Sequence, residues 1–222
     1  MSRRRIMQSQ GHSNELPSGY KIVKYLESSG KQNINTGVPL NNEQIKVKLD
    51  LELPIINPSA NKMLFGVNSI TDNQTHSYFQ IYLANNGNLY MNCGRPYYTT
   101  DLFIASADLH RTEVFLSSGN SAYEVSAFGE KRSGMCDKFR DLNNPIYLFC
   151  RNILGEAYNH ANYKLYNCII EENSKTTRNF IPALDSTGKP CMFDKVTQQP
   201  FYNHGTGEFG YKLLNGTYVA PV

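Results

Sequence analysis

The five histidines are the first residues to consider for catalysis, because histidine is the commonest general acid or base near neutral pH. They lie far apart in the sequence, at His12, His76, His110, His160 and His204. None belongs to an HExxH pattern, and no serine stands in a GxSxG turn. The glycine-spaced segment 205–210 is not followed by a helical pattern, so it does not indicate a phosphate-binding loop. We therefore predict no catalytic residues and no cofactor.

Carboxylates could act in pairs, as glycoside hydrolases require on opposite sides of the scissile bond. Asp50 and Glu52 share one strand-like segment, where we expect them on the water-facing side as solubilising charges. Glu171 and Glu172 are adjacent and would point to opposite faces of a strand. Asp185 is expected to shape the turn that follows it. The sequence therefore predicts that the protein is not an enzyme; it also predicts no metal site, although calcium stays open.

The five cysteines are odd in number and contain no CxxC pair. A zinc site needs closely spaced ligands, and a secreted disulfide framework usually has an even count. We interpret the cysteines as reduced, buried, small apolar side chains. They are Cys93, Cys136, Cys150, Cys168 and Cys191.

An aromatic and basic cluster at Arg95, Tyr97 and Tyr98 is the candidate ligand-binding segment. Tyrosine and arginine offer flat apolar area with polar groups, which suits recognition of sugars or proteins. The alternative is that these tyrosines pack on the rim of a sheet.

The N-terminal segment 1–15 is polar and carries Arg3, Arg4 and Arg5. Such a composition cannot bury enough apolar surface to fold independently. One hypothesis is that the arginines dock the protein onto an acidic partner surface; the other is an ordinary disordered terminus. With a net charge of +3 and only three clustered arginines, we predict no binding to nucleic acid.

The elements that would position these residues are strands. Residues 44–53 alternate apolar and polar side chains over ten positions, which predicts a strand with one face in the core. The turn signal Asn85-Asn86-Gly87-Asn88 predicts a hairpin over 78–93, with Tyr78, Gln80 and Tyr82 on one face. Further strands are predicted at 146–151, 163–171, 178–183 and from 192, with a charged loop over 130–144.

Several segments together resemble a known family. They are PSGY (17–20), YLESSGKQNINTG (25–37), LFCRNILG (148–155) and NFIPALDSTGKPCMFDKVTQQPFYNHGTGEF (179–209). This combination is similar to concanavalin A-like, laminin-G-like jelly-roll modules of bacterial surface proteins and phage structural proteins. The resemblance is specific at both ends and loose between residues 57 and 141. It implies a binding or building module and carries no catalytic residues.

The fold expected is all-β, a two-sheet antiparallel jelly-roll sandwich with little helix. We expect one domain over 16–212 between the arm at 1–15 and an extended tail at 213–222. No apolar run approaches the roughly 18 residues of a membrane span, and the first fifteen residues lack the apolar core of a signal peptide. No membrane association is predicted.

The main functional hypothesis is a non-enzymatic phage virion protein: a capsid decoration, head-fibre or tail-associated module. Its partners would be other virion proteins, with homo-oligomers on the particle and host glycans as further candidates. The alternative is a carbohydrate-binding, lectin-like module of a bacterial surface protein. A glycoside hydrolase or lyase is less favoured, because the sequence shows no carboxylate pair that would span a concave face.

Overall fold

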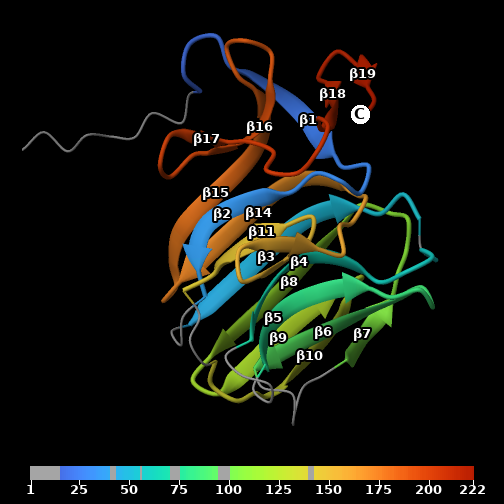
Figure 1. Cartoon of the computed structure of the whole chain (residues 1–222), viewed down its shortest axis with the longest axis vertical. Coiled ribbons are helices and arrows are strands. Elements are labelled where there is room, and N and C mark those ends of the chain that lie inside the picture. The colour runs from blue at the N-terminus through green and yellow to red at the C-terminus, as the bar shows by residue number, and fades with distance from the viewer. Residues whose placement is uncertain (1–15, 41–43, 56, 71–75, 95–100, 140–142) are drawn as a thin grey trace, which may run out of the picture.

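A computed structural model describes residues 16–40, 44–55, 57–70, 76–94, 101–139 and 143–222. Within these ranges every regular element is a strand, and the strands form two sheets that face each other across one core (Figure 1). The all-β two-sheet sandwich predicted from the sequence is therefore confirmed. No helix long and apolar enough to cross a membrane occurs in the described ranges.

The larger sheet contains eleven strands. They are β1 (Lys21–Glu27), β3 (Ile45–Glu52), β8 (Thr112–Gly119), β9 (Ala122–Ala127), β10 (Glu130–Met135), β14 (Lys164–Glu172), β15 (Lys175–Leu184), β16 (Pro190–Asp194), β17 (Gln199–Phe201), β18 (Gly210–Leu213) and β19 (Tyr218–Val219). The smaller sheet contains eight strands. They are β2 (Ile34–Pro39), β4 (Lys62–Ile70), β5 (His76–Leu83), β6 (Asn88–Gly94), β7 (Leu102–Ser106), β11 (Pro145–Leu148), β12 (Arg151–Ile153) and β13 (Glu156–Tyr158).

The core follows from the alternation in the sequence. On β3 the side chains of Val47, Leu49 and Leu51 are fully buried, and the lysines and carboxylates between them face outward. Burying one such side chain contributes about 1.5–3 kcal/mol. Strand β14 carries apolar side chains on both faces and lies between β3 and β1, inside the larger sheet.

The strand orders connect segments that are distant in the chain. The larger sheet runs β10-β9-β8-β3-β14-β1-β15-β16-β17, and the smaller runs β13-β12-β4-β5-β6-β7. Named strand pairs are antiparallel, with the exception of β12 beside β4. Strand β1 pairs with β18 as well as with β14 and β15, which brings the two ends of the predicted domain together.

The hairpin predicted over 78–93 is present as β5 and β6. Their register pairs Tyr78 with Gly94 and Tyr82 with Tyr90. Gly87 has a φ of +79° in the connecting turn, a conformation that costs glycine little. The turn signal in the sequence therefore placed both strands correctly.

The strand predicted at 146–151 is interrupted. Phe149 has a φ of +67°, so the chain bends between β11 and β12. Its ring stacks on Tyr163 at a centroid distance of 4.3 Å, and its backbone N–H donates to the Leu64 carbonyl at 2.9 Å. The aromatic contact and backbone bonds hold a left-handed conformation that is uncommon for a residue with a side chain. As a result, β12 continues beside β4 in the parallel direction.

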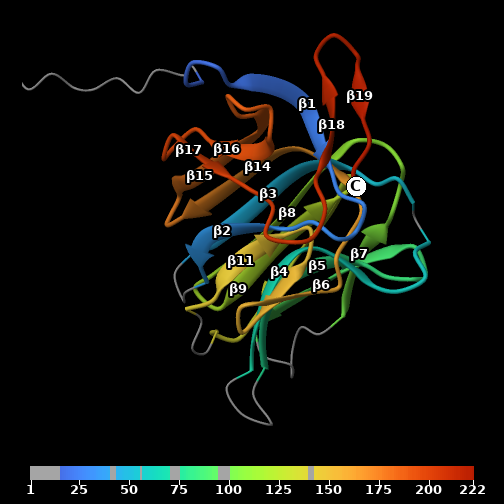
Figure 2. The same cartoon turned by 45° about the horizontal axis from the view of Figure 1, so that its top comes forward.

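Two other segments are more regular than expected. Residues 130–135, predicted as a loop, form β10, which pairs with β9 over six residues. The predicted tail at 213–222 lies largely in a hairpin: after β18 the chain turns at Gly216 and returns as β19, which pairs with β18. This hairpin projects from one end of the sandwich (Figure 2). The signal that could have predicted it is Asn215-Gly216, a pair typical of tight hairpin turns.

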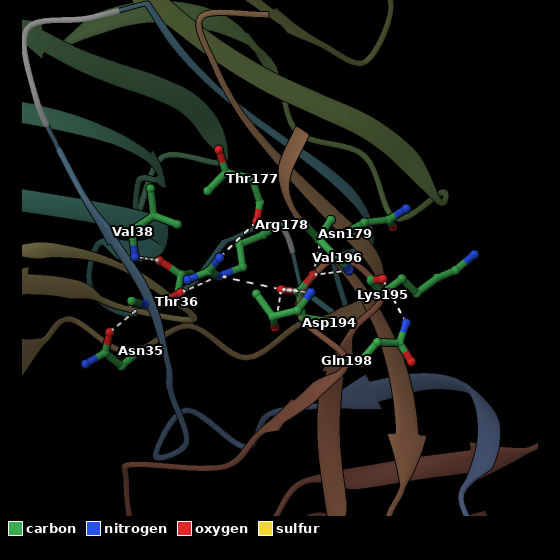
Figure 3. Close-up of polar contacts among 12 residues, drawn as sticks. Asn35, Thr36, Val38, Thr177, Arg178, Asn179, Asp194, Lys195, Val196 and Gln198 are labelled. Carbon is green, nitrogen blue, oxygen red and sulfur yellow. Dashed lines mark hydrogen bonds and ion pairs between the residues drawn. The ribbon is translucent and has the colours of Figure 1, made fainter. Parts of the chain in front are cut away.

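A buried carboxylate organises the turn after β16. Asp194 is fully buried, and its two oxygens accept hydrogen bonds from both neighbouring segments (Figure 3). The donors are the backbone N–H groups of Asn179 (2.8 Å), Val196 (3.1 Å) and Thr197 (3.2 Å), and the Thr197 hydroxyl (2.7 Å). The turn at 194–199 therefore owes its conformation to one side chain.

Arg178 connects this turn to the other sheet. Its Nε lies 3.7 Å from the Asp194 carboxylate and donates a hydrogen bond to the Thr36 carbonyl on β2 at 3.0 Å (Figure 3). The guanidinium thus joins β15 of the larger sheet to β2 of the smaller sheet. A buried carboxylate is tolerated here because several donors and a cation compensate its lost hydration.

We predict that Asp194→Ala lowers the free energy of unfolding by about 3 kcal/mol, because it leaves four hydrogen-bond donors without their acceptor and Arg178 without its counter-charge. Chemical denaturation with urea measures this. The control is Asp50→Ala, which removes a partly exposed carboxylate and should cost less than about 1 kcal/mol. Equal losses in the two variants would show that Asp194 does not organise the turn.

Candidate functional site

The outer face of the larger sheet is a network of ion pairs. Asp50 receives two hydrogen bonds from Arg111, at 2.8 and 2.5 Å, and Glu52 contacts Lys164 at 2.5 Å. Partial burial would raise the pKa of Glu52, but hydrogen bonds from Lys164 and Tyr166 outweigh it and hold that pKa below its usual value. Both carboxylates considered from the sequence are therefore engaged by cations on the water-facing side, as predicted.

The outer face of the smaller sheet has a different character. Strand β5 presents Tyr78, Gln80 and Tyr82 on this face, which is the alternation predicted from the sequence. Asn92 of β6 lies opposite Gln80, and Arg151 of β12 lies opposite Gly66 of β4. Gln80 also pairs with Gly66, so one row of the sheet carries arginine, glycine, glutamine and asparagine in that order.

Three residues of this row, Arg151, Gln80 and Asn92, line a hollow of about 290 Å³. Its lining comes from β4, β5, β6, β12 and the segments beside them, and is polar and aromatic. The lining residues are Asn61, Met63, Tyr78, Gln80, Tyr82, Asn92, Asp101, Arg151 and Asn159. Tyrosine, amide and guanidinium groups in one hollow are typical of a site for a polar ligand.

Gly66 allows the two central side chains to approach each other. A Cβ added at this position would lie 2.6 Å from the Gln80 Cβ and 3.3 Å from the Arg151 Cβ. Any larger residue would therefore displace both flanking side chains. The glycine is required here by close approach, and its own φ is an ordinary one.

Two residues that line this hollow each have a buried side-chain atom that makes no hydrogen bond. These atoms are the Gln80 Oε1, an acceptor, and the Arg151 Nε, a donor. An unmade buried hydrogen bond costs about 1–3 kcal/mol, so native structures satisfy nearly all such groups. A free donor and a free acceptor on either side of Gly66 therefore mark a position where a polar ligand or water would be stabilised.

The charge of Arg151 is not balanced by an ion pair within the residues that the structure describes. Burial lowers the pKa of Arg151 from its usual value, because the guanidinium has lost part of its hydration. Two tyrosines, Tyr78 and Tyr158, are the groups that partly offset this effect. The site thus holds a partly desolvated cation with capacity for an anionic group.

An ordered aromatic pair forms one wall. Tyr82 stacks on Tyr90 with ring centroids 5.6 Å apart, and the Tyr82 hydroxyl donates to Asp101 at 2.5 Å. Burial and the adjacent Asp101 carboxylate raise the pKa of Tyr82, so its hydroxyl stays protonated. The Asp101 N–H in turn donates to the Asn92 side chain at 3.2 Å. This chain of bonds fixes the orientation of the wall.

The site residues named from the sequence lie outside the described ranges. Arg95, Tyr97 and Tyr98, like Arg3, Arg4 and Arg5, fall in segments that the structure does not describe. Asp101, which follows the first of these segments, lines the hollow. The sequence-based list missed Gln80, Asn92 and Arg151. The alternation in β5 identified the correct face, but nothing marked that face as a site.

The remaining conspicuous carboxylate has a structural role. Asp185 accepts from the Thr187 hydroxyl (2.7 Å), from two backbone N–H groups of its turn, and from the Tyr202 hydroxyl (2.8 Å). These bonds, led by the Thr187 hydroxyl, hold the pKa of Asp185 well below its usual value. Asp185 therefore shapes the turn before Gly188, as predicted.

The fold has counterparts among solved structures. The sialidase module "Ruminococcus gnavus IT-sialidase CBM40 bound to alpha2,3 sialyllactose" is 15% identical, with a TM-score of 0.50 over 68% of this chain and 90% of that one. A second structure of that module gives 16% identity and a TM-score of 0.49, with the same coverage. A Trypanosoma rangeli sialidase in complex with 2,3-difluorosialic acid is 10% identical, with a TM-score of 0.48 over 71% of this chain and 27% of that one.

No family model matches the sequence, and no curated protein matches it. The likeness to the sialyllactose-bound module shows a shared jelly-roll-like β-sandwich. It is consistent with the concanavalin A-like fold expected from the sequence motifs.

We predict that Arg151→Met raises the free energy of unfolding by about 1 kcal/mol, because an apolar chain of similar length replaces a desolvated, unpaired charge. A rise of about 2–4 °C in the midpoint of thermal unfolding measures it. The matched control is Arg111→Met, which breaks the pair with Asp50 and should lower stability by up to about 1 kcal/mol. A clear loss of stability in Arg151→Met would show that this arginine is structural.

Proposed function

We propose that this protein is a carbohydrate-binding module whose ligand lies on the outer face of the smaller sheet. The observation that carries the proposal is the unmet donor of Arg151 beside the unmet acceptor of Gln80, in a hollow walled by tyrosines. The unmet donor and acceptor lower the stability of the folded protein, and such local losses of stability are common where a protein binds a ligand.

A sugar matches these groups closely. Its hydroxyls donate and accept, so one hydroxyl could satisfy the Gln80 Oε1 while a ring or glycosidic oxygen accepts from the Arg151 side chain. Its C–H faces pack on aromatic rings, and Tyr78 and Tyr82 stand in the lining. The volume of about 290 Å³ is at the lower limit of ligand pockets, which favours the terminal residue of a glycan.

An acidic sugar fits the charge of the site better than a neutral one. Arg151 can make two parallel hydrogen bonds to a carboxylate, and within the described ranges no ion pair already occupies it. The module whose fold is shared was solved with α2,3- and α2,6-sialyllactose, ligands that carry such a carboxylate. That likeness supports an acidic terminal sugar as the ligand.

We propose binding without catalysis. Hydrolysis by a carboxylate pair needs two groups about 5–9.5 Å apart across the substrate. The lining of the hollow supplies one carboxylate, Asp101, and this one accepts the Tyr82 hydroxyl. On the opposite sheet, Asp50 and Glu52 are held by Arg111 and Lys164.

Titration calorimetry tests the proposal with 3′-sialyllactose and lactose as probes. We expect sialyllactose to bind with a dissociation constant no weaker than about 1 mM, a free energy near −4 kcal/mol, and lactose at least tenfold more weakly. Arg151→Met should abolish the preference, and Arg111→Met should leave it unchanged. No binding of any glycan on a broad array would overturn the proposal. Release of free sialic acid during the titration would instead show an enzyme.

A location on a phage particle remains a second proposal, and it is compatible with glycan binding. The resemblance of the segments 17–37 and 179–209 to jelly-roll modules of phage structural proteins supports it, as does the basic segment with Arg3, Arg4 and Arg5. In this proposal several copies of the module assemble into a homo-oligomer, which attaches to other virion proteins. The glycan site of each copy then faces the host.

We predict that deleting residues 1–13 leaves the midpoint of thermal unfolding nearly unchanged but weakens attachment to particles. Arginines exposed to solvent lose attraction as salt rises, so full-length binding should also fall between about 0.05 and 0.5 M salt. Co-sedimentation with particles that lack the protein measures both effects. Equal sedimentation of the two forms at both salt concentrations would show that the segment is not an anchor.

A further inference from the structure

Two of the five cysteines meet across the sandwich. Cys93 lies near the end of β6 in the smaller sheet, and Cys136 directly follows β10 in the larger sheet. Both are buried in the common core, with exposed fractions of 1% and 4%. Their side chains share a hydrogen bond. For Cys150, Cys168 and Cys191, burial is the largest influence and raises the pKa of each thiol.

Backbone packing brings the pair together. Gly94, the residue after Cys93, has a φ of +82°, and a Cβ added to it would lie 2.7 Å from the Asp137 carbonyl oxygen. The same hypothetical atom would lie 3.3 Å from the Cys136 Cβ. The Cys136 N–H donates to the Ser121 carbonyl at 3.0 Å, which fixes its position beside the β8–β9 turn. The two thiols are thus juxtaposed by a close approach of two backbones.

We propose that Cys93 and Cys136 are a reactive pair, which hydrogen peroxide converts into a disulfide bond joining the two sheets. The Cys136 sulfur attacks one peroxide oxygen, forming Cys136 sulfenic acid and releasing hydroxide. The Cys93 sulfur then attacks the Cys136 sulfur and displaces a second hydroxide. The two thiol protons convert both hydroxides to water, so two thiols are oxidised by two electrons and one peroxide is reduced to two waters.

The environment assigns the first attack to Cys136. The Cys93 thiol and, at 3.5 Å, the Ser118 hydroxyl lie within hydrogen-bonding distance of its sulfur. These contacts, with Cys93 the stronger, lower the pKa of Cys136 and favour its thiolate, the nucleophilic form. The same hydrogen bond and burial raise the pKa of Cys93, which keeps its proton until the second step.

Access is also asymmetric. Cys136 lines a hollow of about 90 Å³ with Ser118, Ser121 and Asp137, and Cys93 is not part of that lining. A space of this size admits a molecule as small as peroxide. Cys136 therefore serves as the attacking residue and Cys93 as the resolving one.

The consequence is a covalent link between β6 of the smaller sheet and the residue that follows β10 of the larger sheet. It closes a loop of about 44 residues, which restricts the unfolded chain and stabilises the folded one. We expect the midpoint of thermal unfolding to rise by about 5–10 °C on oxidation and to return on reduction with dithiothreitol.

Alkylation with mass spectrometry tests the pair in the full-length protein. The reduced protein has five alkylatable thiols once denatured, and one equivalent of peroxide should leave three. Proteolysis should release a peptide pair joined through Cys93 and Cys136. Cys93→Ala and Cys136→Ala should form no intramolecular disulfide, whereas the control Cys191→Ala should form it as the parent does.

Three results would overturn the proposal. They are five alkylatable thiols after peroxide treatment, Cys136 that stops at sulfinic acid, or a disulfide that persists in Cys136→Ala. The first two need only the parent protein, so the test holds even if a variant fails to fold.

Discussion

The candidate site depends on the left-handed conformation of Phe149. This residue bends the chain between β11 and β12, which lets β12 pair with β4 in parallel and places Arg151 opposite Gly66. Its ring is held against Tyr163, whose hydroxyl donates to the Leu64 carbonyl at 2.8 Å, and its carbonyl accepts from the Ala161 N–H at 2.7 Å. Packing in the core thus stabilises the strained backbone of Phe149, and that conformation places Arg151 on the outer surface.

The two outer faces of the sandwich divide stability and binding between them. On the larger sheet the carboxylates of Asp50 and Glu52 are each paired with a cation, so these charges on the water-facing side are compensated within the protein. On the smaller sheet the hollow keeps a donor on Arg151 and an acceptor on Gln80 without protein partners. Because unmet buried groups are rare in native structures, the occurrence of two of the four such atoms of the described residues beside one tyrosine-lined hollow is the strongest indication of function in the described molecule.

Local patterns in the sequence predicted the elements but not the site. Alternation in β3 and the turn at Gly87 each depend on neighbouring residues, so the strands and the outward face of β5 could be predicted. Arg151 joins that face only through the bend at Phe149 and the pairing of β12 with β4, contacts between residues distant in sequence. No glycine marks the bend, and no spacing relates Arg151 to Gln80. The hairpin of β18 and β19 is a different case, because the local pair Asn215-Gly216 could have predicted its turn; only the pairing of β18 with β1 is a contact distant in sequence.

The central claim is that a glycan occupies the hollow lined by Arg151, Gln80 and Asn92. The most direct measurement is a nuclear magnetic resonance titration of ¹⁵N-labelled protein with 3′-sialyllactose, including the side-chain Nε–H signal of arginine. We predict that the largest shifts fall on the Arg151 Nε–H, the Gln80 side-chain amide and the backbone of Asn92, while Arg111 is unaffected. Shifts confined to the face that carries Arg111 and Tyr166, or no shifts at saturating sugar, would contradict the account.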